Sequence, residues 1–108
     1  MTKAPAAVLI RLKAFARERG FRVTHGSGGK HNAGSLHPLN RAIDVSVKGK
    51  TNEQVEQFME AARAAGYRVL DERTRPPGQD VWRGRHLHVE DRREFPEEKL
   101  YINRYKIK

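Results

Sequence analysis

The residues of this chain that are best suited to chemistry are its five histidines. Two of them, His86 and His88, flank Leu87 in a segment that alternates between polar and apolar residues, as β-strands do. Residues two apart on a strand project from the same face, so both imidazoles should point to one side while Leu87 faces the core. The pair could act as two metal ligands, as one ligand and one acid–base group, or simply as two polar residues on a wet sheet face.

A second segment brings an imidazole and a carboxylate into the same stretch of chain. His37 ends a glycine-rich loop, and Asp44 follows in a segment that alternates like a strand. The apolar residues on either side of Asp44 should face the core, so its carboxylate should point toward a site or solvent. Nitrogen and oxygen donors suit zinc, which binds them at about 2.0–2.2 Å. Together with His88 these residues supply the three protein ligands of a catalytic zinc site, which leaves its fourth position to water.

The pattern of apolar residues predicts the elements that must position these side chains. It favours an α+β domain with a small, mostly antiparallel sheet of about four strands and two main helices. Pro5 suits the first position of one helix, and Gln54, three residues after Thr51, should complete a capping box at the start of the other. The expected helices are 5–19 and 51–66, and the expected strands are 21–24, 41–47, 67–71 and one within 81–90.

Composition limits the classes of protein to which the chain can belong. Its 108 residues predict a single domain over 1–108, and the absence of cysteine excludes disulfides and thiolate metal sites. No apolar run approaches the roughly 20 residues of a membrane helix. Arg11 and Lys13 interrupt the apolar N-terminal run, so no secretory signal is expected and the chain should be cytoplasmic when made.

The net charge of +9 indicates a polyanionic partner. Nucleic acid is the common partner of such a surface. The anionic polymers and acidic stem peptides of a bacterial cell wall are a second class of partner, and solubility alone is the alternative without a partner.

Two motifs give the chain a resemblance to a known group of enzymes, and they are Ser35-x-His37-x-x-Asn40-x-Ala42-x-Asp44 and His86-x-His88. The first resembles the metallopeptidase signature Ser-x-His-x-x-Gly-x-Ala-x-Asp, and the second resembles its partner His-x-His. The group contains lysostaphin-type enzymes, D-alanyl-D-alanine carboxypeptidases and hedgehog signalling domains, and peptidase family M15 is the most similar within it. The resemblance covers about residues 23 to 90.

The resemblance implies a role for each matching residue. His37, Asp44 and His88 would bind one Zn²⁺, and His86 would act as the acid–base or transition-state-stabilising histidine. Ser35 would support the loop that carries the metal site. The chain would thus be a zinc-dependent peptidase of the endopeptidase or carboxypeptidase type, acting on peptidoglycan peptides, as a phage endolysin does after its release to the cell wall.

The sequence also departs from the pattern of that group. Asn40 replaces the motif glycine, and asparagine tolerates the left-handed backbone that such a turn requires. Arg85 stands where many of these peptidases carry a Glu or Asp, three residues before the last zinc ligand. Either His86 must therefore supply the acid–base group or Glu90 must reach back to do so.

Three cationic or imidazole side chains are candidates for holding a substrate carboxylate, and each could equally be a solvated surface group: Lys30, His31 and Arg41. Trp82 could line a substrate groove, although a single tryptophan more often packs in a core or at an edge.

Two other functions fit parts of the sequence. His-hydrophobic-His is also the motif of single-strand DNA nickases that use a downstream tyrosine, here Tyr101 or Tyr105, and the positive charge suits DNA. That interpretation leaves the segment from His37 to Asp44 unexplained. The other alternative is a non-catalytic domain that zinc stabilises and that binds cell wall or nucleic acid through its charge.

Overall fold

The computed structural model describes residues 2–26, 35–75, 77–78, 82 and 84–93. Two α-helices, a short 3₁₀ turn and four strands make up the described part of the chain. In chain order these are α1 (Ala6–Glu18), β1 (Val23–His25), η1 (His37–Leu39), β2 (Ala42–Ser46), α2 (Asn52–Ala64), β3 (Arg68–Glu72) and β4 (His86–Glu90).

The four strands form one sheet in the order β1-β2-β4-β3, and every neighbouring pair is antiparallel. The predicted α+β class is therefore confirmed, because two helices accompany a four-stranded antiparallel sheet. The register places Asp44 of β2 opposite His88 of β4, and Glu72 of β3 opposite His86. Side chains opposite each other on adjacent strands share a face, so these four residues lie on the same side of the sheet.

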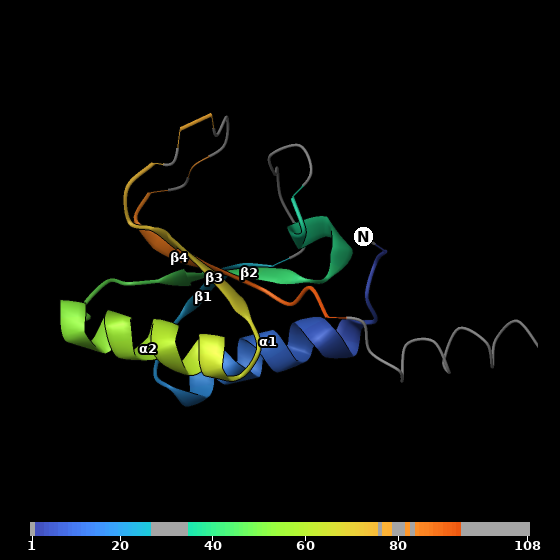
Figure 1. The fold of residues 1–108 in the computed structure, drawn as a ribbon, viewed down its shortest axis with the longest axis horizontal. Helices are drawn as coiled ribbons and strands as arrows, with labels where there is room; N and C mark the ends of the chain where they lie inside the picture. The colour runs from blue at the N-terminus through green and yellow to red at the C-terminus, as the bar shows by residue number, and fades with distance from the viewer. Residues whose placement is uncertain (1, 27–34, 76, 79–81, 83, 94–108) are drawn as a thin grey trace, which may run out of the picture.

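Both helices cover one face of the sheet, while the segments around η1 and after β3 rise on the other face (Figure 1). The core lies between the helices and the sheet, because alternate strand residues such as Ile43, Val45, Leu87 and Val89 pack there with the apolar stripes of α1 and α2. The residues between them on β2 and β4 must then face the opposite side. That alternation turns Asp44, His86 and His88 away from the helices.

Local sequence explains where the helices begin. In α2 the Thr51 hydroxyl accepts from the Gln54 backbone N–H, and the Gln54 side chain accepts from the Thr51 N–H, which confirms the predicted capping box. Pro5 immediately precedes α1 instead of occupying its first position. With ψ at 154° its backbone is extended, so it is the N-cap residue and the helix begins at Ala6.

Asn40 adopts the left-handed backbone that the sequence predicts, with φ at 59°. It ends η1, and its side chain donates a hydrogen bond to the Ala4 carbonyl at 3.0 Å. This bond ties the turn that carries His37 to the segment before α1. Within the described residues, no helix has both the length and the apolar character needed to cross a membrane.

Candidate metal centre

Three buried side chains from separate parts of the chain meet above β2 and β4. His37 Nε2 lies 3.1 Å from Asp44 Oδ1 and 3.1 Å from His88 Nδ1, and the latter atom lies 3.2 Å from Asp44 Oδ1. We call these three atoms the ligand triangle. All three residues are less than a tenth exposed. The structure therefore brings together the three residues predicted as metal ligands, in a group that could hold a metal ion.

The size of the ligand triangle fits zinc. Tetrahedral coordination at about 2.0–2.1 Å separates neighbouring ligand atoms by about 3.3 Å. The three observed separations of 3.1, 3.1 and 3.2 Å are close to that value and close to one another. The triangle thus resembles one face of a zinc tetrahedron, which leaves the fourth corner for a water or a substrate atom.

His37 is held by the turn that precedes β2. Its Nδ1 lies 2.9 Å from the Gly26 carbonyl, which can only accept, so Nδ1 carries the proton. Nε2 is thus the nitrogen that faces the triangle, where it lies within hydrogen-bond distance of Asp44 and would offer its lone pair to a bound metal ion. The Ser35 hydroxyl accepts from the His37 backbone N–H at 3.2 Å, so Ser35 supports this turn without touching the triangle.

His88 is oriented by a carboxylate on its own strand. Glu90 is two residues further along β4, on the same face, and its Oε1 accepts from His88 Nε2 at 2.8 Å. That bond leaves Nδ1 to face the triangle. Outer partners of this kind fix the tautomer of metal-binding histidines. Glu90 is itself held by Arg92 at 2.5 Å and by Arg68 at 3.6 Å.

The charges in the site depend strongly on one another. Burial alone would raise the pKa of Asp44, but hydrogen bonds from His37 and His88 keep it well below its usual range. Burial would lower the pKa of His88, yet its bonds to Asp44 and Glu90 raise it to about 9. Burial would raise the pKa of Glu90, but its hydrogen bonds with His88 and Arg92 lower the pKa to about 2. The site therefore favours positive charge at its centre, supplied by protons or by a metal ion.

His86 occupies the neighbouring position on the same face. Its Nδ1 lies 2.6 Å from the Gly84 carbonyl and its Nε2 lies 2.6 Å from Glu72 Oε2, so both ring nitrogens face acceptors. Asp44 Oδ1 is 3.6 Å from the same Nε2. Burial would lower the pKa of His86, but the hydrogen bonds to Glu72 and Gly84 and the charges of Asp44 and Glu72 together outweigh it, so the pKa is raised.

Glu72 is a site residue that sequence reasoning missed. It ends β3 and looks like an ordinary charged residue at the start of a polar loop, yet it is only 5% exposed. The antiparallel register with β4 places it opposite His86, and no local sequence pattern predicts that pairing. His25 was also missed as a neighbour of the site: its Nδ1 lies 3.7 Å from Asp44 Oδ2.

Within the described residues, the structure does not place any of the three predicted substrate-binding residues at the ligand triangle. Lys30 and His31 lie outside the described residues. Arg41 is 2% exposed, and its guanidinium donates to the backbone carbonyls of Thr2, Asp91 and Arg93. Arg41 therefore holds chain segments together, and this placement does not support a contact with substrate.

Two further sequence expectations concern aromatic residues. Trp82 is partly buried, and its indole N–H donates to the Glu72 carbonyl at 3.2 Å, so it packs at the end of β3 as the commoner role of a single tryptophan suggests. Tyr101 and Tyr105, the candidate nickase nucleophiles, lie outside the described residues.

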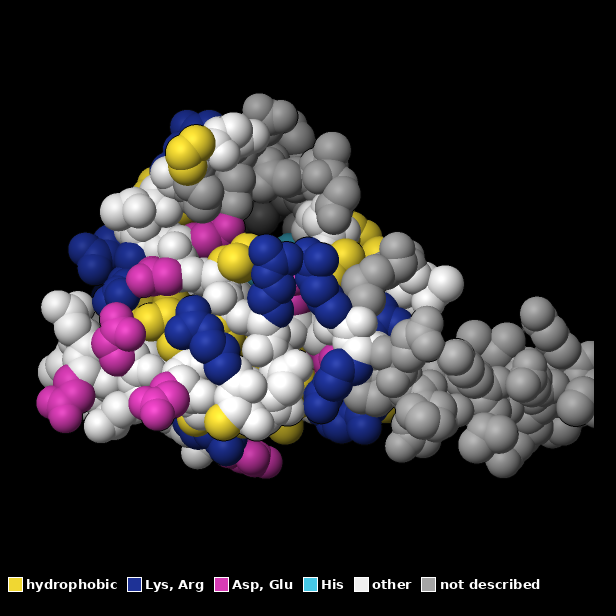
Figure 2. Space-filling model, in the orientation of Figure 1, with side chains coloured by type: hydrophobic (Ala, Val, Ile, Leu, Met, Phe, Trp, Pro, Cys, Tyr) yellow, Lys and Arg dark blue, Asp and Glu magenta, His cyan; other side chains and the backbone are white. Residues whose placement is uncertain are grey.

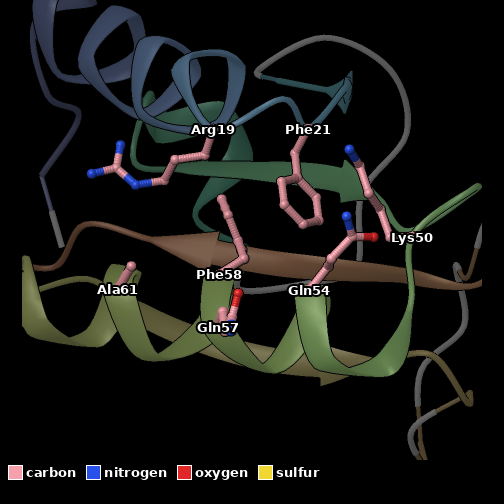
Figure 3. A pocket seen from close by; sticks show the side chains of 7 residues that line it. All are labelled: Arg19, Phe21, Lys50, Gln54, Gln57, Phe58 and Ala61. Atoms are coloured by element: carbon pink, nitrogen blue, oxygen red, sulfur yellow. The ribbon is translucent and has the colours of Figure 1, made fainter.

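The pocket on the helical side of the structure lies apart from the ligand triangle. It has a volume of about 340 Å³ and involves the end of α1, Lys50 and α2, and no candidate ligand lines it (Figure 3). Lys and Arg side chains are spread over the face shown in Figure 2, where histidine is almost hidden. His37, His86 and His88 are each less than a tenth exposed.

Comparison with known proteins adds no assignment to these observations. The chain matches no family model, no curated protein and no solved structure. The candidate function must accordingly be argued from the residues of the site.

Proposed function

We propose that this protein is a zinc-dependent peptidase that hydrolyses an amide bond in bacterial cell-wall peptides. The ligand triangle carries the proposal: two imidazole nitrogens and one carboxylate oxygen, each 3.1–3.2 Å from the others. Outer hydrogen bonds to Gly26 and Glu90 fix the two ring orientations. Three protein ligands and an open position are the arrangement of catalytic zinc sites.

Zinc held at this site would activate a water molecule and polarise the scissile carbonyl. The chain's own residues would handle the protons. Both nitrogens of His86 face acceptors, so both act as hydrogen-bond donors in the structure. His86 Nε2 is therefore placed to donate to the developing oxyanion and to the leaving amine.

Glu72 supplies the carboxylate that Arg85 cannot supply. It lies 2.6 Å from His86 Nε2 and reaches the site from β3, instead of from position 85, immediately before β4, where many of the resembling peptidases carry a carboxylate. A carboxylate in this place could take the proton of the attacking water and pass it through His86. Glu90 is already engaged with His88, so we assign it to ligand orientation.

The substrate class rests on two supports. The first is the resemblance of the His37–Asp44 and His86–His88 motifs to peptidases that act on peptidoglycan. The second is the net charge of +9, which suits the carboxylates of stem peptides and anionic wall polymers.

Mass spectrometry of peptidoglycan fragments, after incubation with the zinc-loaded protein, tests the proposal. We expect new amine and carboxylate termini from the wild type and from Glu56→Gln, a control at an exposed carboxylate of α2. His37→Ala should lose both its zinc and its hydrolysis. Continued hydrolysis by metal-free His37→Ala would exclude the zinc mechanism, whereas zinc binding without any product would leave a non-catalytic zinc-stabilised domain.

A further inference from the structure

A second group of ligand-type atoms lies beside the ligand triangle and shares one residue with it. Asp44, Glu72 and His86 each place one nitrogen or oxygen within 4.8 Å of the others, and all three residues are buried. We call these residues the second cluster. They come from three adjacent strands, β2, β3 and β4, so the sheet itself fixes their spacing.

The orientation of His86 points its ligand nitrogen into the second cluster. Nδ1 donates to the Gly84 carbonyl at 2.6 Å, as Nδ1 of His37 does to Gly26. Metal-binding histidines typically donate their other ring N–H to such a carbonyl, which fixes the orientation of the nitrogen that binds the metal. That other nitrogen, Nε2, faces Glu72 Oε2 at 2.6 Å and Asp44 Oδ1 at 3.6 Å.

The negative charge of the two carboxylates in the second cluster also favours the binding of a cation. Two buried carboxylates, Asp44 and Glu72, lie beside His86, and buried anions are stabilised by positive charge. One divalent ion in the ligand triangle would neutralise much of the Asp44 charge, while Glu72 would keep its hydrogen bond with the Nε2 proton of His86. A second divalent ion could replace that proton, which would leave to solvent.

We propose that Asp44, Glu72 and His86 form a second divalent-cation site, with Asp44 bridging it to the ligand triangle. One nitrogen and two carboxylate oxygens suit zinc and similar first-row divalent ions. Carboxylate-bridged metal pairs separated by about 3.5–4 Å are a known arrangement in hydrolytic sites.

The second site should bind more weakly than the first. It offers one imidazole instead of two, and its ion must displace a proton from a hydrogen bond of 2.6 Å between His86 and Glu72. If the proposed peptidase activity holds, filling this site would occupy His86 and should depress hydrolysis at high zinc concentrations. The binding itself does not depend on that activity.

Equilibrium dialysis against Zn²⁺, followed by metal analysis of the purified full chain, tests the second site. We expect the wild type to bind one ion tightly and a second ion at a higher free concentration, with saturation at two per chain. Glu72→Gln keeps the size of the side chain but removes its charge, so this variant should retain the tight ion and lose the weaker one. Glu56→Gln, a matched change at an exposed carboxylate, should still bind two.

The outcomes separate this proposal from the proposed function. Saturation of the wild type at one ion, or a Glu72→Gln protein that still binds two, would overturn the second site. If circular dichroism shows that Glu72→Gln does not fold, His86→Gln replaces it, with the same expectation of one ion. A protein that binds two ions but cleaves no cell-wall peptide would refute the peptidase and leave the second site standing.

Discussion

Asp44 and His88 lie directly opposite each other on β2 and β4, with Asp44 Oδ1 and His88 Nδ1 3.2 Å apart. This cross-strand pair places two of the three candidate zinc ligands on neighbouring strands of one sheet, where hydrogen bonding fixes their separation. His37 alone comes from a turn, and Ser35, Gly26 and Asn40 hold that turn or its side chain in place. The site should therefore be largely preorganised for a metal ion.

Zinc should raise the thermal stability of the protein through the ligand triangle. Zinc at about 100 times its Kd adds about 2.7 kcal/mol to the free energy of unfolding. For a domain of this size, that is an increase in Tm of roughly 10–20 °C. Melting curves with and without zinc should show this increase for the wild type and almost none for His37→Ala. His25→Asn, a histidine change outside the triangle, should keep most of it, and equal increases in all three proteins would contradict the assignment.

Glu90 should tune the affinity for zinc without binding the ion. It accepts from His88 Nε2 at 2.8 Å, and the loss of such an outer partner typically weakens metal binding about 10- to 100-fold. Competition with a coloured zinc chelator should reveal this weakening in Glu90→Ala. Glu56→Gln should match the wild type. An unchanged affinity in Glu90→Ala would show that Glu90 does not orient His88.

The stability of the metal-free protein, measured with a chelator present, should decrease both as the pH rises and as the pH falls. The pKa of His88 is raised from 6.5 to about 9, so its contribution is complete below pH 6.5 and is lost as the pH rises through 9. The pKa of Glu90 is lowered from 4.5 to about 2, so its contribution is complete above pH 4.5 and is lost as the pH falls through 2. Urea unfolding with EDTA should thus show greatest stability between about pH 4.5 and 6.5.

Above pH 6.5 the affinity for zinc should increase with pH, whereas the stability of the metal-free protein should decrease. Metal binding requires His88 Nδ1 to lose its proton, so affinity should increase as the pH rises toward 9. Calorimetric titrations at several pH values would measure this trend. A metal-free protein whose stability also increased from pH 6.5 to 9 would contradict the charge balance described for the site.

Arg41→Met should destabilise the protein rather than impair substrate binding directly. The guanidinium is buried and donates to three backbone carbonyls, which would lose a charged partner. Hydrogen bonds to charged groups contribute about 1.5–3 kcal/mol each, so we expect a loss of at least about 2 kcal/mol in urea unfolding. The folded variant should bind zinc with nearly unchanged affinity. A variant of normal stability with a raised KM would restore Arg41 as a substrate-binding residue.

Short-range sequence patterns are enough to predict the helices, the strands and part of the site. The alternation around Leu87 placed His86 and His88 on one face, and the apolar neighbours of Asp44 turned its carboxylate away from the core. Thr51 and Gln54 specified the start of α2. These features follow from periodicity and capping, which depend on residues close together in the chain, so sequence patterns alone could predict them.

Which distant residues meet depends on the packing of the whole sheet, and the sequence does not reveal it. The strand order β1-β2-β4-β3 sets Asp44 against His88 and Glu72 against His86, and nothing in the local pattern of β3 distinguishes Glu72 from a solvated end residue. Arg41 likewise resembles a surface cation in sequence but is buried among backbone carbonyls. The physical reason is that cross-strand register and burial arise from packing of the whole sheet, whereas periodicity reports only which face of its own strand a residue occupies.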